Sequence, residues 1–419
     1  MSKNTPFLQE PVIIIGAGVS GLTLAQACRK ENIPYRIFER DDSATHRSAG
    51  WGLTIHWALP TFKALLPDYL VSRLPECYVN RGAVEAGEKG SFTFFDLSTG
   101  EPRWQVPAAE RIRVSREKLR ALLLTGLDVE WSKSLQNVEV VDGAVKAAFA
   151  DGTSCTGSML VGCDGANSVV RRLLHSEDYQ NKQLPIRLLG ATAQYTESQI
   201  TAIRNLDPFF LQGTDPKTDT YLWFSFLETP SDGLPPDTYK CQIIISWPYR
   251  ENWLDRVDPT ECPNTRTGQS FLMKNLSESW AEPFRSLVQN MPKDSDIRPI
   301  ELADWLPRPS PSTGFAGRVM LAGDSAATMV MYRGEGANHS IVDVSKLLEQ
   351  IKPLYEIVDG NVDGLFLLAR LAYESEMIER KEVAVRASRR ACLDAHEYAR
   401  IDESSPLVKR RVMRTDLEE

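Results

Sequence analysis

The chain has 419 residues, of which 42% are hydrophobic and 25% charged, values typical of a soluble globular protein long enough for two domains. A formal net charge of −8 argues against a nucleic-acid surface and offers no basic patch to an anionic membrane. The seven cysteines show no Cys-x-x-Cys spacing, so neither a zinc site nor a disulfide framework is indicated. Because no window of 18 apolar residues occurs either, we expect a cytoplasmic protein without a transmembrane segment or a metal ion.

The first predicted element is a buried parallel strand, residues 11–15, followed at once by the glycine pattern Gly16-x-Gly18-x-x-Gly21. Glycines at this spacing make a strand-to-helix turn, let the backbone approach a pyrophosphate, and let the helix pack closely on the strand. A second strand, residues 35–38, ends at Glu39, where a carboxylate can hold ribose hydroxyls. This arrangement predicts a binding site for an adenine dinucleotide.

The next segment is less regular. We expect a glycine- and tryptophan-containing loop over residues 47–57, a short helix near 61–66, a strand around 92–95, and a helix over 111–124 capped by Ser115. Arg116 would lie in the first turn of that helix, where a cation is unfavourable unless an anion is bound. We therefore predict a phosphate contact for Arg116, with a solvated helix-end arginine as the alternative.

Residues 129–161 predict a small antiparallel meander, because two Asp-Gly pairs separate β-rich runs. A buried strand over 159–162 follows and leads into Asp164-Gly165-x-x-Ser168-x-x-Arg171. Asp164 is thus placed at the carboxyl end of a strand, where a ligand contact and a helix cap are compatible roles.

The composition changes after residue 185. Three aromatic-rich and β-branched runs, 187–195, 221–228 and 239–247, predict an antiparallel sheet inserted between pieces of the first domain. We expect the chain to return to helix over 264–291, and its longest helix to span 365–399.

A third motif lies between the inserted sheet and the last helices. A short strand, residues 319–322, ends at Gly323-Asp324, and Gly334-x-Gly336 opens a helix over 337–351. Asp324 can accept hydrogen bonds from a polyol, and the helix N-terminus favours negative charge. Both properties suit a flavin, with its ribityl hydroxyls and its anionic reduced ring; an ordinary strand–loop–helix corner is the alternative.

In this order the three motifs resemble those of the class A flavoprotein monooxygenases, the single-component FAD-dependent aromatic hydroxylases with the para-hydroxybenzoate hydroxylase fold. The chain is most similar to their fungal, salicylate-hydroxylase-like members of secondary metabolism. The resemblance covers residues 11 to about 350. It implies an α/β fold in which a discontinuous, Rossmann-like FAD-binding domain with a β-meander (1–75, 105–183, 297–351) carries an inserted antiparallel-sheet substrate domain (76–104, 184–296) and C-terminal helices (352–419).

The resemblance also implies a reaction. In such enzymes FAD is reduced by NAD(P)H, reacts with O2, and transfers oxygen from a C4a-hydroperoxide to a bound substrate. For this chain we expect an apolar aromatic or polycyclic natural product. Two alternatives stay open: a non-oxygenating flavoenzyme (oxidase, dehydrogenase or cyclase) on the same scaffold, and a flavin-free binding protein of the same fold.

By the same resemblance, Glu39 would hold the adenosine ribose, Arg116 the phosphate or ribityl region, and Asp324 the ribityl chain. Asp164 and Arg171 belong to a motif associated with both FAD and NAD(P)H. The full set of predicted cofactor-binding residues is Gly16, Gly18, Gly21, Glu39, Arg40, Arg47, Gly52, Arg116, Asp164, Arg171, Gly323, Asp324, Gly334, Gly336, Ala337 and Asn338.

The third motif departs from the family pattern at two positions. Relatives carry a histidine and a proline where this chain has Ala327 and Met331, and the rigid proline helps to shape the oxygenation pocket. Oxygen insertion is therefore the part of the prediction that depends on Met331. The candidate catalytic residues are Met331, Tyr332, His56, Tyr195 and Tyr221, with packing or hydrogen-bonding roles as their alternative.

Overall fold

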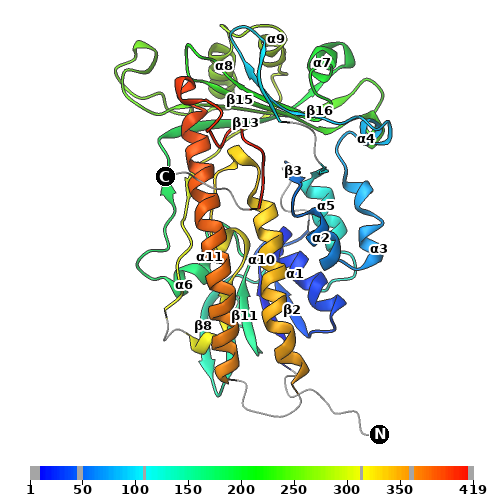
Figure 1. The fold of residues 1–419 in the computed structure, drawn as a ribbon, viewed down its shortest axis with the longest axis vertical. Coiled ribbons are helices and arrows are strands. Elements are labelled where there is room, and N and C mark those ends of the chain that lie inside the picture. The colour runs from blue at the N-terminus through cyan, green and yellow to red at the C-terminus, as the bar shows by residue number, and fades with distance from the viewer. Residues whose placement is uncertain (1–9, 45–50, 107–109, 312–314, 358–362, 414–419) are drawn as a thin grey trace.

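The computed structural model describes residues 10–44, 51–106, 110–311, 315–357 and 363–413. Its first layer is a five-stranded parallel sheet in the order β19-β11-β1-β2-β7 (Figure 1). The strands are β1 (Val12–Ile15), β2 (Tyr35–Phe38), β7 (Val129–Glu130), β11 (Met159–Gly162) and β19 (Val319–Leu321). Because both faces of this sheet are covered, β1 and β11 are apolar throughout and buried at every position.

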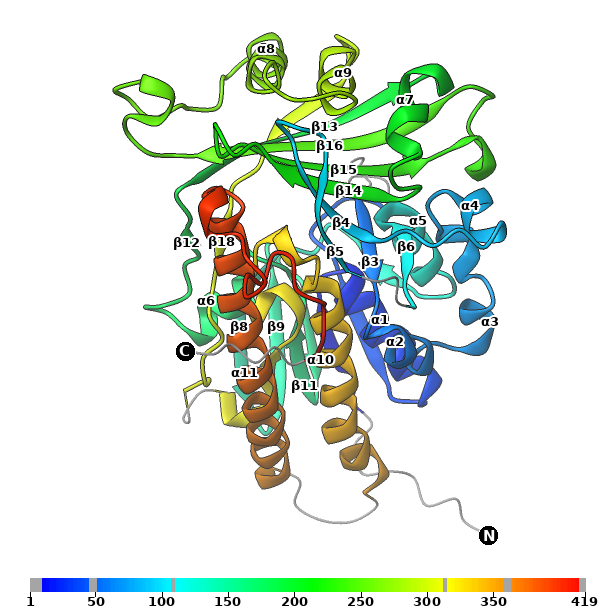
Figure 2. The ribbon, with the colours of Figure 1, turned by 45° about the horizontal axis from the view of Figure 1, so that its top comes forward.

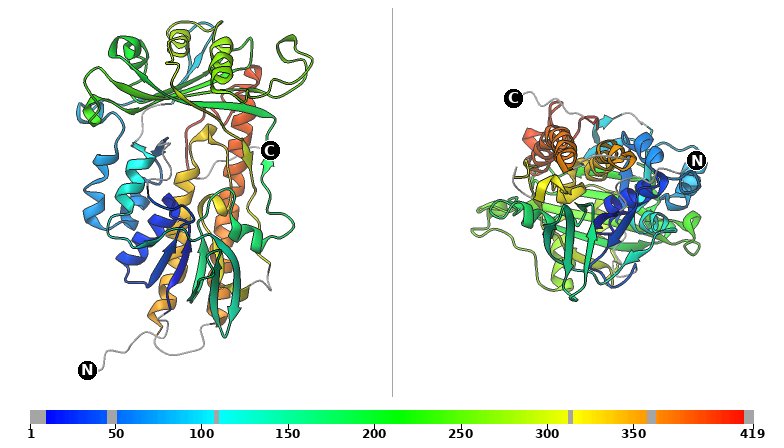
Figure 3. Two further views of the ribbon diagram at one scale, coloured as in Figure 1. Left: turned by 180° about the vertical axis from the view of Figure 1, so that it is seen from behind. Right: turned by 90° about the horizontal axis from the view of Figure 1, so that it is seen from below.

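Helices and a small second sheet cover the parallel sheet. α1 (Val19–Lys30) packs beside α10 (Gly336–Ile351), and α10 in turn packs beside the long α11 (Asp363–Asp394), as Figure 1 shows. The predicted meander is present as β8 (Leu135–Val141), β9 (Ala144–Phe149) and β10 (Ser154–Gly157), which contact β1 and β11 (Figure 3).

A seven-stranded sheet lies across one end of the parallel sheet (Figure 2). Its order is β17-β13-β16-β15-β14-β4-β5, with all pairs antiparallel except β14 and β4. The strands are β4 (Phe92–Asp96), β5 (Pro102–Val106), β13 (Ile186–Tyr195), β14 (Phe210–Thr214), β15 (Tyr221–Glu228), β16 (Tyr239–Pro248) and β17 (Asp296–Pro299). α7 (Glu197–Arg204), α8 (Arg266–Leu276) and α9 (Phe284–Gln289) cover its outer face, so its inner face looks toward the first domain.

The remaining elements connect the two layers. β3 (Gly52–Ile55) pairs with β6 (Ile112–Ser115), and β12 (Lys182–Gln183) pairs with β18 (Ala303–Asp304). The connecting helices are α2 (Leu59–Leu65), α3 (Asp68–Val71), α4 (Arg81–Glu85), α5 (Arg116–Leu123) and α6 (Val169–Leu174). No helix among the described residues combines the length and the apolar character needed to cross a bilayer.

The predicted fold class is confirmed, and the division into domains given above stays a prediction. Three elements were predicted wrongly. The loop over 47–57 contains β3, and the first residues of the helix over 111–124 form its partner β6, because Ile112 and Val114 alternate into the core before Ser115 caps α5. The helix over 264–291 is two helices, since Pro283 cannot continue a helical hydrogen-bond ladder.

Candidate cofactor and substrate site

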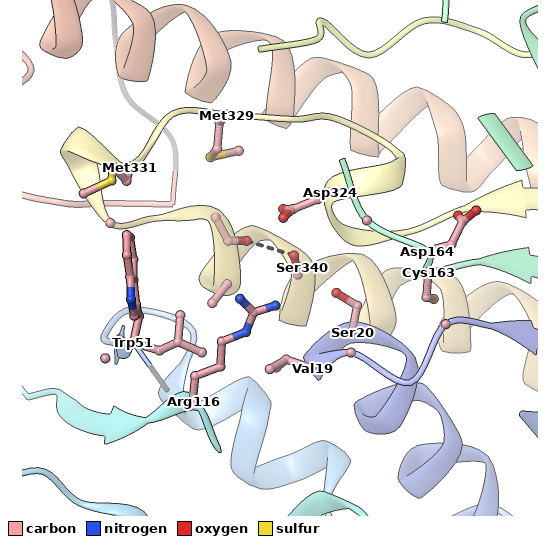
Figure 4. A pocket seen from close by; sticks show the side chains of 18 of the residues that line it. Val19, Ser20, Trp51, Arg116, Cys163, Asp164, Asp324, Met329, Met331 and Ser340 are labelled. Atoms are coloured by element: carbon pink, nitrogen blue, oxygen red, sulfur yellow. Dashed lines mark hydrogen bonds between the residues drawn. The ribbon is translucent and has the colours of Figure 1, made fainter. Parts of the chain in front are cut away.

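A cavity of about 360 Å³ lies between the carboxyl ends of the parallel strands and the inner face of the seven-stranded sheet. Figure 4 shows that the loops of all three predicted motifs supply its walls. Predicted cofactor residues that line it are Gly16, Gly18, Glu39, Arg40, Gly52, Arg116, Asp164, Asp324, Gly334, Gly336 and Ala337. The topology therefore brings residues from positions 16 to 337 around one space.

The first glycine turn has one position with room for a ligand. Gly16 has φ +103°, and a Cβ there would lie 2.5 Å from the carbonyl oxygen of Cys163. A Cβ on Gly21 would lie 2.0 Å from the carbonyl oxygen of Gly16, so this glycine serves helix–strand packing. A Cβ on Gly18, by contrast, meets no atom within 4 Å and would extend into open space. Gly18 is thus the position at which a bound group can approach the backbone.

Glu39 is buried beside that turn and contacts its backbone. The Ala17 N–H donates to Oε2 of Glu39 at 2.7 Å, and the Asp41 N–H donates to Oε1 at 3.2 Å. Arg120, from α5, donates its Nε–H to the carbonyl oxygen of Ala17 at 2.9 Å. The sequence analysis missed Arg120, because nothing in the spacing of α5 connects it to a turn about 100 residues earlier. Glu39 lines the cavity while it also supports the turn.

The opposite wall presents a carboxylate and helix N-termini. Asp324 follows β19, and its exposed side chain lines the cavity without accepting a hydrogen bond from any described residue (Figure 4). The first residues of α1 and α10 line the same space, and neither helix has an acidic residue in its first turn. A ligand with hydroxyls near Asp324 and negative charge near the helix N-termini fits this wall.

Aromatic and sulfur-containing side chains line the cavity near the sheet. Trp51 and Met331 face it from the first domain (Figure 4), and Tyr221 and Trp223 of β15 line it from the sheet. His56 lies where this cavity meets a second one of about 240 Å³. Burial, together with Arg411, Arg111 and Arg333, lowers the pKa of His56 to about 3, so its imidazole is neutral at neutral pH.

Comparisons with known proteins agree with this geometry. The model of the NAD(P)-binding Rossmann-like domain family matches residues 14–65. A protein of Arthroderma benhamiae named "Probable FAD-dependent monooxygenase" is 46% identical over 98% of this chain and 96% of its own length. The FAD-dependent monooxygenase dbaB of Emericella nidulans is 40% identical over 84% of this chain and 88% of its own. The chain belongs to the FAD-dependent monooxygenase family.

Solved structures agree on the fold of this monooxygenase. The 2,6-dihydroxypyridine-3-hydroxylase of Arthrobacter nicotinovorans superposes with a TM-score of 0.75 at 19% identity, covering 99% of this chain and all of that one. HpxO of Klebsiella pneumoniae, solved with FAD and uric acid, gives 0.71 at 17% identity over 93% and 90% of the two chains. The predicted family and the predicted enzyme class are both confirmed.

Asp164 of the monooxygenase is a helix cap as well as a cavity residue. It accepts hydrogen bonds from the Ser168 hydroxyl at 2.5 Å and from the Val169 N–H at 2.7 Å, at the start of α6. Burial raises the pKa of Asp164, and these donors oppose that shift. The position of Asp164 is therefore compatible with both a helix cap and a ligand contact, and its contact with a cofactor stays a prediction.

Several predicted cofactor residues lie behind the cavity wall. Arg171 is buried against the Trp305 ring and donates to the Thr328 hydroxyl at 3.1 Å. Asn338 ties β3 to α10, because it accepts from the His56 N–H at 2.9 Å and donates to the Thr54 carbonyl at 2.9 Å. Gly21, Arg171, Gly323 and Asn338 do not line the cavity, so their places in the wall favour support of the site over direct contact. Arg47 lies outside the described residues.

Two of the catalytic candidates are placed away from the cavity. Tyr195 lies on the outer face of the seven-stranded sheet, where its hydroxyl donates to the Leu287 carbonyl of α9 at 2.7 Å, which fits the hydrogen-bonding role given as its alternative. Tyr332 is buried beside the cavity loop and donates to the Ser246 hydroxyl at 2.9 Å. Met331, His56 and Tyr221 do line the cavity, and Tyr221 donates to Gln212 at 2.9 Å.

Proposed function

We propose that this monooxygenase binds FAD in the cavity, takes electrons from NAD(P)H, and inserts one oxygen atom of O2 into an apolar aromatic or polycyclic compound. The observation that carries the proposal is the single cavity that joins the Gly18 turn and Asp324 to the aromatic inner face of the sheet. A dinucleotide at one end and a flat substrate at the other would share this space.

The residues present fit FAD. The open space over Gly18 suits the pyrophosphate, Glu39 the adenosine ribose, and the exposed carboxylate of Asp324 the ribityl hydroxyls. When bound, FAD would supply hydride acceptance and O2 activation. The start of α10, at Gly336 and Ala337, would lie near the isoalloxazine, where the helix N-terminus favours negative charge.

The residues near the sheet would hold and enclose the substrate. Trp51, Tyr221 and Trp223 offer aromatic faces to a planar ring, and Val330 and Met331 add apolar surface that excludes water. One structural neighbour is named as a hydroxylase of 2,6-dihydroxypyridine and the other was solved with uric acid, and both compounds are flat rings. These two compounds support a planar substrate for this enzyme, but they do not identify it.

Isotope labelling tests the oxygen-insertion step. We expect the purified protein to be yellow, to release FAD, and to oxidise NADH or NADPH faster when an accepted phenol, indole or terpenoid is present. Mass spectrometry should find one labelled oxygen atom in the product formed under ¹⁸O2. Reduction of the flavin without labelled product for any accepted substrate would favour the non-oxygenating flavoenzyme, which Ala327 and Met331 keep as the second candidate.

We further propose that the enzyme works in the cytoplasm. All seven cysteines are unpaired, and six of them are buried. Unpaired thiols are typical of a reducing compartment. Fractionation of the producing cells with an antibody to the protein tests this location.

A further inference from the structure

The inner face of the seven-stranded sheet carries polar residues among its aromatic ones. Along β15, Leu222, Phe224 and Phe226 pack outward beneath the covering helices, so Tyr221, Trp223 and Ser225 point inward. On the neighbouring β16, Gln242 pairs with Ser225 across the two strands. These two polar side chains therefore lie side by side on the inward face, where Gln242 lines the cavity.

Arg113 reaches the same place from β6. Its Nε–H and Nη2–H donate to the Ser225 hydroxyl at 3.2 and 2.9 Å, and its Nη1–H donates to the Thr54 hydroxyl at 3.0 Å. The guanidinium lines the cavity, and only 9% of the residue is exposed. Two neutral hydroxyls are thus its hydrogen-bond partners, and a guanidinium has five N–H groups to place.

Arg113 has no acidic partner among the described residues. No acidic group acts on its charge there, and the acidic residues that line the cavity, Glu39, Asp164 and Asp324, belong to the dinucleotide end. Burial and, to a smaller extent, the nearby Arg111 lower the pKa of Arg113 to about 9, so the group stays charged at neutral pH. A buried cation without a counter-ion is costly, so an anion supplied from outside the chain would stabilise it.

Gln242 is the second group that lacks a partner. It is 3% exposed, and its side-chain amide makes no hydrogen bond to a described residue; Oε1 is fully buried. Buried polar groups in folded proteins are nearly always hydrogen-bonded. The donor end of this amide, the Nε2 group, makes no hydrogen bond to a described residue either, so it can donate to an acceptor atom of a ligand in the cavity.

We propose that the substrate of this enzyme carries an anionic oxygen, a carboxylate or an ionised hydroxyl, which Arg113 binds and Gln242 helps to position. The inference rests on the proposed function, because it places the oxyanion at the sheet end of the cavity and the flavin at the other. It adds to that function a charge requirement: an apolar ring alone leaves Arg113 without a counter-ion. Arg113 and Gln242 thereby become residues that determine specificity.

Binding of matched ligand pairs to the FAD-loaded protein tests the charge requirement. Isothermal titration calorimetry compares 2-naphthoate with 2-naphthamide, and ionised 4-nitrophenol with 4-nitroanisole, at pH 8. We expect at least tenfold tighter binding of one anion than of its neutral partner, because a charge-assisted hydrogen bond is lost with the neutral ligand. The first pair reports a carboxylate and the second a phenolate.

Variants assign the preference to residues. Arg113→Gln should abolish the preference for the anion while the bound FAD spectrum is unchanged, and Arg113→Lys should keep part of it, since lysine retains the charge but not the fork. Gln242→Leu should weaken anion binding several-fold. Gln269→Leu is the matched control, because Gln269 is a buried glutamine of α8 that does not line the cavity.

The outcomes distinguish a failure of the proposed function from a failure of the charge requirement. A protein that fails to bind FAD contradicts the proposed function itself. An FAD-loaded protein that binds anionic and neutral partners equally, or that binds none of the four, contradicts the charge requirement and leaves the flavoenzyme intact. If Arg113→Gln does not fold, the other two variants test the proposal. The proposal is contradicted if Gln242→Leu and Arg113→Lys each keep the full anion preference of the wild type.

Discussion

Asp324 is the residue whose position most directly predicts a cofactor contact. Its carboxylate is exposed in the cavity and accepts no hydrogen bond from a described residue, so its removal costs the protein little. A hydrogen bond to a charged acceptor contributes roughly 1.5–3 kcal/mol. We expect Asp324→Ala to weaken FAD binding by about that amount in fluorescence titrations, with Glu349→Gln on the exposed side of α10 as the control. Unchanged FAD affinity in the folded variant would show that Asp324 is only structural.

A substitution at Gly18 can show whether a ligand approaches the backbone there, because it should not disturb the fold. Its φ of −81° and ψ of −175° suit any residue, and a Cβ there meets no protein atom within 4 Å. We expect Gly18→Ala to leave the free energy of unfolding of the FAD-free protein unchanged, or higher by up to about 1 kcal/mol. The added methyl would occupy ligand space, so FAD should no longer raise the melting temperature. A destabilised FAD-free variant would instead make Gly18 a requirement of the turn.

At the scale of elements, the loop between β19 and α10 carries Ala327 and Met331, the two residues at which the sequence analysis predicts a departure from the family pattern. Met331 begins a short 3-10 turn (Met331–Arg333), and the preceding Val330 is extended, with ψ 159°. A proline at position 331 would suit both features. Proline is tolerated at the first residue of a helix, and it favours an extended conformation in the residue before it. The family's proline is therefore compatible with this loop.

We expect Met331→Pro to retain FAD and NAD(P)H oxidation while it changes the ratio of oxygenated product to hydrogen peroxide. The reason is that only the lining of the reactive space is altered, and a flexible thioether fills such space differently from a rigid ring. Product and peroxide are quantified together in one reaction, with Met329→Leu as a volume-matched control in the same loop. An unchanged ratio would mean that residue 331 does not line the reactive face.

A buried charge network joins α10 and α11 to the turn that carries Asp324. Lys381 donates to the Gly323 carbonyl and to Asp343, each at 2.7 Å, and the Gly323 N–H donates to Asp343 at 2.8 Å. Burial alone would raise the pKa of Asp343, but Lys381 and Arg380 hold it below its usual value. Both backbone groups of Gly323 are thus fixed by the long C-terminal helices.

We expect Lys381→Met to lower the free energy of unfolding by about 3 kcal/mol, because breaking one partner of a buried ionic network typically costs 3–5 kcal/mol. FAD affinity should fall as well, since the turn before Asp324 loses its support. Urea unfolding of the FAD-free protein measures the first effect. Lys346→Met, which removes an exposed pair on α10, should change stability by less than about 1 kcal/mol. Equal effects of the two variants would contradict the role given to the network.

The elements also show what the sequence can predict. The glycine turn, the Ser115 and Ser168 caps and the Gly323-Asp324 corner depend on residues a few positions apart, and spacing predicts them. The inward face of the large sheet does not follow from spacing. Both faces of β13 and β15 are covered, so polar and apolar residues do not alternate there, and the pattern could not show on which face Tyr195 lies.

Partners far apart in the sequence were missed for a related reason. Arg113 meets Ser225, and Lys381 meets Gly323, only after the sheet topology has brought distant segments together. No local pattern marks such pairs, because each residue satisfies its ordinary propensity where it stands. Arg113 was further obscured by the expectation of a helix over 111–124.

At the scale of the whole molecule, buried neutral histidines connect folding to pH. His396 follows α11 and is 2% exposed; its Nδ1–H donates to the Cys392 carbonyl at 2.6 Å, and its Nε2 lies 2.8 Å from the Ser246 hydroxyl. Burial lowers the pKa of His396 to about 4 and that of His339 well below its usual value. Both side chains must gain a proton when the chain unfolds in mild acid.

The direction of the pH effect follows from these shifts. Because the folded pKa of His396 lies below the unfolded value of 6.5, its contribution to stability is fully present above pH 6.5 and is lost progressively as the pH falls toward 4. Each pKa unit corresponds to about 1.4 kcal/mol, so His396 alone should cost roughly 2 kcal/mol between pH 6.5 and pH 5. Urea unfolding at these two pH values measures the loss. His396→Gln, which cannot titrate, should show a loss smaller by about that amount, and a variant whose pH dependence equals that of the wild type would show that His396 is already protonated in the folded protein.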